Sequence, residues 1–492
     1  NERREEEKFI VNEKSKSNRK LWFSVYGVGN VGYELIYEFF KNFQNFFLTD
    51  ICGFSTLITG SLITTVNVCK AIFTPISGIL IDADPFKRKD KHTPWVLGMP
   101  VFLGALYILM AYFAWKGLSG TLILVLFSIF YFLPVLLQNG YRSAIPSMAM
   151  NAQEASFLSG AINVGSNAGR VLTGIIVPVI MVKMSADGKS EDARGFFWAV
   201  AVSVVLAVIV YWTSVLGIKK TIRADALRQA GKEVQSAGKK QGTGFVKMIA
   251  MIFTDKNILI PFVCGLGIFF RTFVVAPTAP YFFKYVTGDM LQYATFSTAT
   301  NIAGVASCFV APFIVSKICA DTKKVCVISV SLCIICHLIL FISGSSTAGF
   351  IVLMTLAQFF YQGTSVLLFG MFVNAVDASE LKVRKRGDKK VASGTAMSLH
   401  FTAVMCAQVL GGAVRNVALS QAGYIGTETA ASDSLTKGLI NMYAIWPTVF
   451  LAAGLIALFF YTLDAKTMKA IHEELDPLRE AAASEAQNAM KK

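Results

Sequence analysis

Charged side chains inside long apolar stretches are the feature of this sequence most suited to chemistry. Glu34, Glu38 and Lys41 share one such stretch. Their spacing places them on one face of an α-helix, because residues three or four positions apart are neighbours there. Five further cations lie inside stretches of the same kind: Lys70, Arg142, Arg170, Arg271 and Arg415. A charge at bilayer depth is strongly unfavourable, so these residues are expected to face a partner or a water-filled path.

Glu34, Lys70 and Arg142 are the strongest candidates for a functional role. A carboxylate and two cations within one helix bundle suit the binding of a charged ligand or the transfer of a proton. The alternative is that Glu34 and Lys70 form an ion pair that only ties two helices together. Glu38 and Lys41 could likewise neutralise each other.

The elements that hold these residues are predicted to be transmembrane helices. Of the 492 residues, 54% are hydrophobic and 16% are charged, which leaves too little charge to cover a soluble protein of this length. The mean hydropathy is +0.55. A spanning helix needs about 20 mostly apolar residues. Twelve stretches meet this need, at about 22–49, 52–82, 95–115, 119–147, 155–183, 196–218, 257–285, 291–318, 325–343, 347–375, 392–420 and 438–463. The expected fold class is therefore an all-α integral membrane protein with twelve transmembrane helices.

The basic residues orient these helices. Alternate connections, together with the two ends of the chain, hold 34 of the 46 Lys and Arg residues, whereas the opposite connections hold six. Because Lys and Arg accumulate on the cytoplasmic side, both termini are predicted to be cytoplasmic, which requires an even number of helices.

The longest polar connection divides the predicted helices into two bundles of six. The expected organisation is a cytoplasmic N-terminal segment, an N-terminal bundle, a cytoplasmic linker, a C-terminal bundle and a cytoplasmic tail, at 1–20, 21–218, 219–256, 257–463 and 464–492. Asp82 and Asp321 precede basic residues at equivalent joints of the two halves and are predicted to act in inside-loop gating; ordinary loop charge is the alternative. Arg271 would face the substrate path if the halves are symmetric.

Several other classes of protein are not supported by the sequence. The net charge of +15 comes from short basic clusters between apolar spans, so no nucleic-acid partner is expected. No P-loop is present, the nine cysteines lack metal or disulfide spacing, and no catalytic set appears, so we expect neither an enzyme nor a cofactor nor a metal site. The glycines in 163–169 and at 411–412 are typical of close helix packing. Residues 1–20 lack an apolar core, so no cleavable signal peptide is expected there.

A set of short motifs resembles a known transporter family. They are Tyr26-Gly-Val-Gly29, Gly32-Tyr-Glu34, Phe46-Phe-Leu-Thr-Asp50, Ala71-Ile-Phe-Thr-Pro75-Ile-Ser-Gly78 with Asp82, Pro94-Trp95, Ser143-Ala-Ile-Pro146, Val376-Asp377-Ala-Ser-Glu380 and Gly423-Tyr424-Ile425. In them the chain resembles the glycoside–pentoside–hexuronide:cation symporters, a branch of the major facilitator superfamily that includes the melibiose permease. The match covers most of residues 20–465 and is specific in the first 150. It implies the major facilitator fold, alternating access and a sugar-type site between the two halves.

The resemblance also implies roles for individual residues. Glu34 occupies the place of an acidic sugar-binding residue, and Lys41 that of an aromatic that lines the cavity. Gln138 takes the place of a second sugar-binding acid. Arg142 takes that of an aromatic that stacks on the sugar. With Lys70 and Arg271, these residues form the predicted substrate site.

The second predicted helix departs from the family pattern. The family's cation site is an acid followed by Asn-Asp-Pro, but here the corresponding residues are Lys70 and Phe73-Thr74-Pro75. An ammonium repels sodium, so the sodium site is expected to be lost. Lys70 is predicted to take the place of the ion and to pair with Glu34.

These exchanges predict an anionic substrate, because the site has gained cations and Arg suits two-point binding of a carboxylate or sulfonate. A hexuronide, a glucuronide or a sulfonated sugar is expected, carried by a secondary active transporter and coupled to protons through Glu34 or Glu38. The alternatives are a lysolipid or other non-sugar transporter of this fold, and a membrane scaffold or sensor that transports nothing. A monomer in a bacterial inner membrane is expected.

Overall fold

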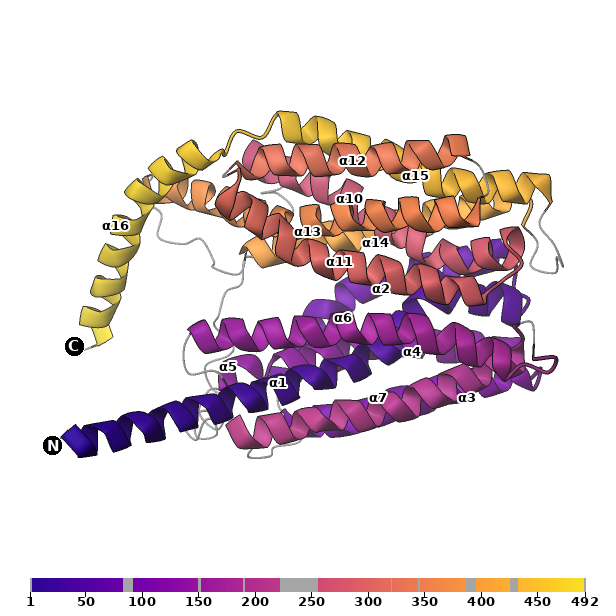
Figure 1. Ribbon diagram of the computed structural model, residues 1–492, viewed down its shortest axis with the longest axis horizontal. Helices are drawn as coiled ribbons and strands as arrows, with labels where there is room; N and C mark the ends of the chain where they lie inside the picture. Colours follow the sequence, from indigo (N-terminus) through magenta and orange to yellow (C-terminus); the bar gives the residue numbers. More distant parts are fainter. Residues whose placement is uncertain are drawn as a thin grey trace. The chain divides into compact units, whose positions relative to one another are not determined.

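The computed structural model describes residues 2–82, 92–148, 152–188, 191–221, 255–319, 321–343, 346–385, 395–424 and 432–490. Every regular element within these ranges is helical (Figure 1). The prediction of an all-α protein is therefore confirmed for this part of the chain. The predicted linker, 219–256, lies outside the described residues except at its two ends.

The helices follow the predicted spans one by one. The first half of the chain forms α1 (Glu2–Phe46), the π-helical η1 (Phe47–Ile51), α2 (Thr56–Asp82), α3 (Thr93–Trp115), α4 (Gly120–Arg142), the short α5 (Ile145–Met148), α6 (Ala152–Lys183) and α7 (Ala193–Thr221). The second half forms α10 (Lys256–Tyr281), the π-helical η4 (Phe282–Val286), α11 (Leu291–Lys317), α12 (Thr322–Ser343), α13 (Thr347–Lys385), α14 (Thr395–Gln421), α15 (Asp433–Phe459) and α16 (Ala465–Met490).

Eleven of the described helices are long and apolar enough to cross a membrane. Large apolar side chains remain exposed on them, as Ile342 does at 83%, and a lipid environment would cover such surface. Helix α1 is not among the eleven, because its first half is rich in charge and its second half carries Glu34, Glu38 and Lys41. The predicted count of twelve and the cytoplasmic position of the termini therefore remain predictions.

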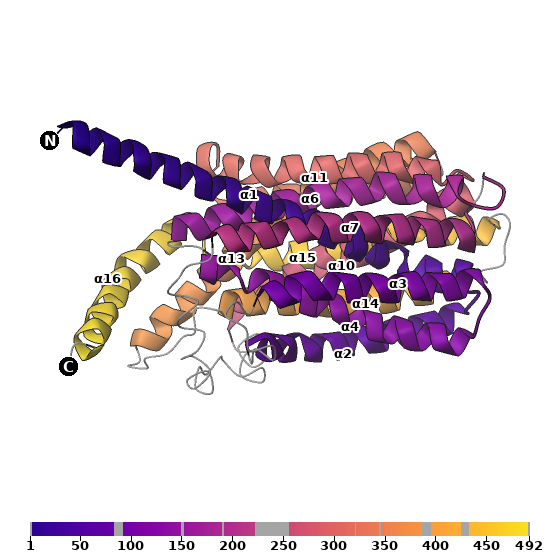
Figure 2. The same ribbon diagram turned by 90° about the horizontal axis from the view of Figure 1, so that it is seen from below.

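The chain forms two compact units. Unit 1 contains residues 1–240, 279–301 and 425–430, and unit 2 contains 241–278, 302–424 and 431–492. In unit 1, α1 packs against both α6 and α7, α3 packs on α4 and α7, and α2 packs on α4 (Figures 1 and 2). In unit 2, α12 packs against α13 and α15, α14 against α13 and α15, and α16 against α13. The predicted bundle limits, 21–218 and 257–463, stay predictions.

Glycines bring α1 and α6 into close contact in unit 1. A Cβ atom on Gly165 would lie 2.0 Å from the Gly27 carbonyl oxygen, and one on Gly169 would lie 2.7 Å from Glu34 Cβ. Gly165 and Gly169 are four residues apart, so they form one small-residue face that lets two backbones approach. The predicted packing role of 163–169 is confirmed. Gly411 has the same role in unit 2, where a Cβ would lie 2.9 Å from Phe273 Cβ.

Substituting Gly169 tests how tightly this contact is packed. Gly169→Ala should destabilise the protein by about 1–3 kcal/mol, because the new methyl group would overlap Glu34 and Val31 of α1. The midpoint of thermal unfolding in detergent measures this change. Gly160→Ala is the matched control on the same helix, since nothing lies within 4 Å of its Cβ position. It should leave the midpoint unchanged or raise it. Equal midpoints for the two variants would contradict the packing account.

Candidate substrate and coupling site

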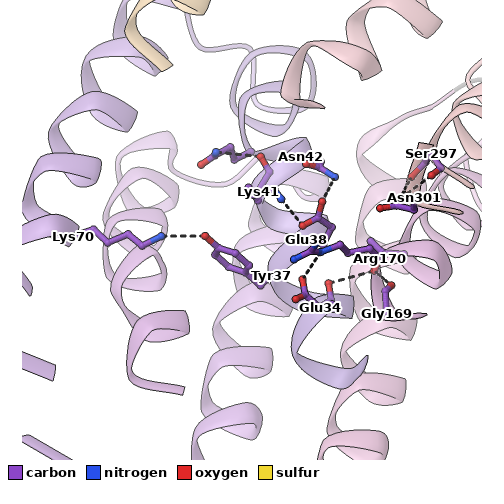
Figure 3. A network of polar contacts seen from close by, with 12 residues as sticks. Glu34, Tyr37, Glu38, Lys41, Asn42, Lys70, Gly169, Arg170, Ser297 and Asn301 are labelled. Carbon is purple, nitrogen blue, oxygen red and sulfur yellow. Dashed lines mark hydrogen bonds and ion pairs between the residues drawn. The ribbon is translucent and has the colours of Figure 1, made fainter. Parts of the chain in front are cut away.

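The predicted polar stripe of α1 lies within unit 1, and Figure 3 shows its side chains and their contacts. Glu34 is 4% exposed and Glu38 8% exposed, and Lys41 follows one turn further on. Helical periodicity brings the three side chains to one side of α1, and the glycine contact places this side next to α6. Charges that are buried in this way require partners from neighbouring helices.

Arg170 of α6 is the cation that pairs with Glu34. Its Nε lies 3.6 Å from Glu34 Oε2. The adjacent Gly169 sets the close approach of the two helices, and Thr173 one turn on donates its hydroxyl to the Glu34 carbonyl oxygen at 3.3 Å. The predicted pairing of Glu34 with Lys70 is therefore wrong. The reason is geometric, because α6 contacts this face of α1 closely and α2 packs instead on α4.

Lys70 contacts aromatic rings of neighbouring helices. Its Nζ donates a hydrogen bond to the Tyr37 hydroxyl at 3.2 Å and lies 5.2 Å from the Tyr37 ring centroid and 5.5 Å from that of Tyr131. The side chain is buried, with 5% of the residue exposed. In the part of the chain that the structure describes, no carboxylate forms an ion pair with Lys70. The ammonium is thus held by a hydroxyl and by ring faces, which neutralise none of its charge.

Glu38 is fully engaged by its own helix. Lys41 donates to Glu38 Oε2, and the Asn42 side chain donates to Glu38 Oε1 at 3.1 Å. The interpretation that Glu38 and Lys41 neutralise each other is confirmed as geometry. Between the two acids of the stripe, Glu34 therefore has the looser ion pair, and we regard it as the better candidate for binding a transported proton.

Gln138 and Arg142 lie together at the end of α4. With the amide oriented to satisfy its neighbours, Gln138 Oε1 accepts hydrogen bonds from Arg142 Nε at 3.0 Å and Nη2 at 3.2 Å. Arg142 is exposed and is the last residue of its helix. Their predicted role in binding substrate remains a prediction.

Arg271 lies in unit 2, in the middle of α10, and is 1% exposed. Its Nε donates to His337 Nε2 at 2.9 Å, its Nη1 donates to Gln358 Oε1 at 2.8 Å, and its guanidinium lies 5.1 Å from the Tyr361 ring centroid. The sequence predicted Arg271 as a candidate site residue, but it did not predict these partners, which lie on α12 and α13.

The two predicted gating acids differ in what the structure shows. The Asp82 side chain lies outside the described residues, although Asp82 ends α2. Asp321 Oδ1 accepts backbone hydrogen bonds from Lys323 at 3.0 Å and Lys324 at 3.4 Å, at the start of α12. This contact caps the helix, and a gating role for either acid stays a prediction.

A further ion-pair cluster joins distant segments of unit 1, and sequence reasoning missed it. Lys284 of η4 lies 2.9 Å from Asp50 Oδ1 of η1 and 3.5 Å from Glu191 Oε1 in the α6–α7 connection. Tyr285 also donates to Asp50, whose side chain is completely buried. Both η1 and η4 are π-helical, a conformation that often marks functional positions. A sequence signal existed only in the two polar residues, each of which follows a phenylalanine-rich run.

The fold defines a class of protein, the helical membrane proteins that share their fold with solved transporters. The solved structure of the nucleoside transporter NupG matches with a TM-score of 0.60 and 13% sequence identity, covering 90% of this chain and 100% of that one. At this identity, the likeness shows the fold alone.

The sequence comparisons then identify the family. The model for MFS/sugar transport proteins matches residues 25–465, and the chain belongs to this family. An isoprimeverose transporter of Lactiplantibacillus pentosus is 24% identical over 89% of this chain and 88% of the relative. A putative sulfoquinovose importer of Escherichia coli is 23% identical over 92% of each chain. The resemblance to the glycoside–pentoside–hexuronide:cation symporters is confirmed. The chain is thus a transporter of sugar-type small molecules, not an enzyme, and an integral membrane protein of the bacterial inner-membrane type.

Glu191 gives the ion-pair cluster a pH dependence. Burial raises the pKa of its carboxyl above the ordinary value of 4.5, and the Lys284 ammonium offsets this only in part. A raised folded-state pKa favours folding below the unfolded pKa, and this contribution is lost as pH rises through the folded pKa. Glu191→Gln should therefore gain stability relative to the parent protein as the pH rises from about 4 to 8. Thermal unfolding midpoints of both proteins across this range measure the difference, and a midpoint of Glu191→Gln that falls relative to that of the parent protein as the pH rises would contradict the assignment.

Proposed function

We propose that this transporter carries an anionic sugar, such as a hexuronide, a glucuronide or a sulfonated sugar, together with a proton. The observation that supports this is the buried Lys70 ammonium of unit 1. Among the described residues it has a hydroxyl and two ring faces as partners, but no carboxylate.

The charges around α1 do not balance. The carboxylates of Glu34 and Glu38 lie in this part of unit 1 with the cations Lys41, Lys70 and Arg170 (Figure 3). Two of the cations are held by the two acids, so the charge of Lys70 is in excess. A buried charge without a partner is unfavourable, and a ligand that brings one negative charge would relieve that cost. A neutral sugar of the same shape would not.

Proton coupling follows from the Glu34–Arg170 pair. When a proton binds Glu34, the carboxylate loses its charge and the Glu34–Arg170 ion pair is lost. The positive charge of this part of unit 1 then rises by one, which favours an anion, so that proton and acidic sugar bind better together than apart. Linkage makes this coupling reciprocal, because a bound anion must favour protonation of Glu34 by the same factor. Glu38 is the weaker candidate because Lys41 and Asn42 already hold both of its oxygens.

The relatives are compatible with this reading. One is a putative importer of sulfoquinovose, a sugar that bears a sulfonate, and another is a transporter of isoprimeverose, which is neutral. These two names include one acidic and one neutral sugar, so the relatives favour neither charge class for this chain. Lys70 favours the acidic class.

Uptake by purified protein in lipid vesicles tests the proposal. Labelled methyl glucuronide and methyl glucoside are compared under an inward proton gradient, an inward sodium gradient, or neither. We expect proton-driven uptake of the glucuronide, at least about tenfold faster than that of the glucoside, which corresponds to about 1.4 kcal/mol. Sodium-driven uptake, or uptake of the glucoside alone, contradicts the proposal. Movement of neither sugar would instead favour the lysolipid alternative.

Two lysine variants separate substrate recognition from stability. Lys70→Met should remove the preference for the glucuronide while leaving the fold intact, because no carboxylate loses a partner. Lys41→Met is the matched control: it leaves Glu38 buried without its cation and should lower stability and the uptake of both sugars. If Lys70→Met lowers the uptake of the acidic and the neutral sugar equally, Lys70 does not discriminate between them by charge.

A further inference from the structure

Arg271 is a second buried cation without a carboxylate partner, and it lies in unit 2. Its two hydrogen-bond acceptors, the His337 ring nitrogen and the Gln358 amide oxygen, are both formally neutral. Within the described ranges no acid forms an ion pair with Arg271. The Cys333 thiol also forms a hydrogen bond with Arg271, and the other titratable groups beside the guanidinium are the Cys336 thiol and the Tyr361 phenol. The positive charge is therefore solvated by dipoles rather than neutralised.

The hydrogen bonds of His337 fix it as a permanent acceptor. Its Nδ1 is bonded to the Tyr443 carbonyl oxygen, which can only accept, so Nδ1 carries the hydrogen. The other ring nitrogen, Nε2, then has a free lone pair and accepts from Arg271 Nε. This arrangement holds the Nε side of the guanidinium in position.

The Nη edge of the guanidinium is the part left for a ligand. Nη1 donates to Gln358 at 2.8 Å, and Nη2 donates to no described oxygen or nitrogen. Gln358 is only half-buried, whereas Arg271 and Tyr361 are buried. The amide oxygen of Gln358 thus occupies the place that one oxygen of a carboxylate would take, on the more accessible side of the arginine. A planar anion with two oxygens matches the spacing of the two Nη atoms.

We propose that Arg271 binds the acid group of a carboxylate or sulfonate ligand through its Nη1–Nη2 edge, and that this acid group displaces the Gln358 amide oxygen from Nη1. The inference rests on the proposed function in one respect, that the acid group belongs to the transported sugar. The same chemistry would also bind a small free anion such as acetate. Acetate is therefore included as a probe, so that an acid group of the sugar can be told apart from a free anion.

Gln358→Glu is the sharpest test. It changes the neutral amide into a carboxylate at hydrogen-bond distance from Nη1, so that Arg271 receives an internal counter-ion and no longer needs an external one. The variant should fold at least as well as the parent protein, because it completes a buried ion pair. Gln362→Glu is the matched control: it adds the same charge one turn along α13, at a residue without a hydrogen bond to Arg271.

Calorimetric binding to the full chain in detergent uses methyl glucuronide, methyl glucoside and acetate as probes. We expect Gln358→Glu to weaken binding of the glucuronide by about tenfold or more and to leave the glucoside unchanged. Gln362→Glu should show a clearly smaller loss. Arg271→Lys, which keeps the charge and loses the two-nitrogen edge, should weaken the glucuronide to a similar degree as Gln358→Glu.

The outcomes separate this inference from the proposed function. Parent-like binding of the glucuronide by Gln358→Glu, or equal losses of binding in both glutamate variants, overturns the Arg271 site. In that case the proposed function still stands if Lys70→Met removes the preference for the glucuronide over the glucoside. If acetate binds in an Arg271-dependent way without any preference for the glucuronide over the glucoside, Arg271 remains an anion site and the proposed function is contradicted.

Discussion

The close contact between α1 and α6 is the constraint on which the charged site depends. Gly165 and Gly169 leave no room for side chains between the two helices, and Arg170 follows directly after the second glycine. The guanidinium therefore reaches Glu34 from the neighbouring helix. A pair of this kind is expensive to desolvate and is retained only where the surrounding helices fix its geometry. Because Glu34 pairs with Arg170, the partners of Lys70 among the described residues are the Tyr37 hydroxyl and two aromatic rings.

Among the described residues, each unit contains a buried cation whose hydrogen-bonding partners are neutral groups. In unit 1 this is Lys70, and in unit 2 it is Arg271. Their environments differ in a way that suits different tasks. Lys70 is a compact ammonium beside two tyrosine rings, which favours a negative charge without defining its orientation. Arg271 is planar and is held by His337, which favours an anion with two oxygens in one plane.

Much of the fold could be predicted from the sequence, because hydropathy and charge report directly on the membrane. The twelve predicted stretches coincide with helices, and the stripe of Glu34, Glu38 and Lys41 follows from helical spacing alone. The glycines of α6 could be assigned to packing for the same reason. The partner of Glu34 could not be predicted, since it depends on how α6 is rotated about its axis. A clue was present in the Gly169–Arg170 sequence, where a residue that allows close approach is followed by a cation.

The sequence could not predict the partners of Arg271 or the Asp50–Lys284–Glu191 cluster. His337 and Gln358 are 66 and 87 residues from Arg271 in the chain, and Lys284 is 234 residues from Asp50. No local pattern links such residues, because their contact is a product of tertiary packing. The same applies to the π-helical segments, which share no motif beyond aromatic residues followed by a polar one.

The claim at the centre of this account is that protonation of Glu34 and binding of an acidic sugar favour each other. Proton uptake on ligand binding tests it most directly, by adding methyl glucuronide to the purified protein in weakly buffered solution and recording the pH. The account predicts that the parent protein takes up protons as the glucuronide binds, and that Glu34→Gln binds the same ligand without any uptake. Binding of the glucuronide by the parent protein with no proton uptake, or with proton release, would contradict it.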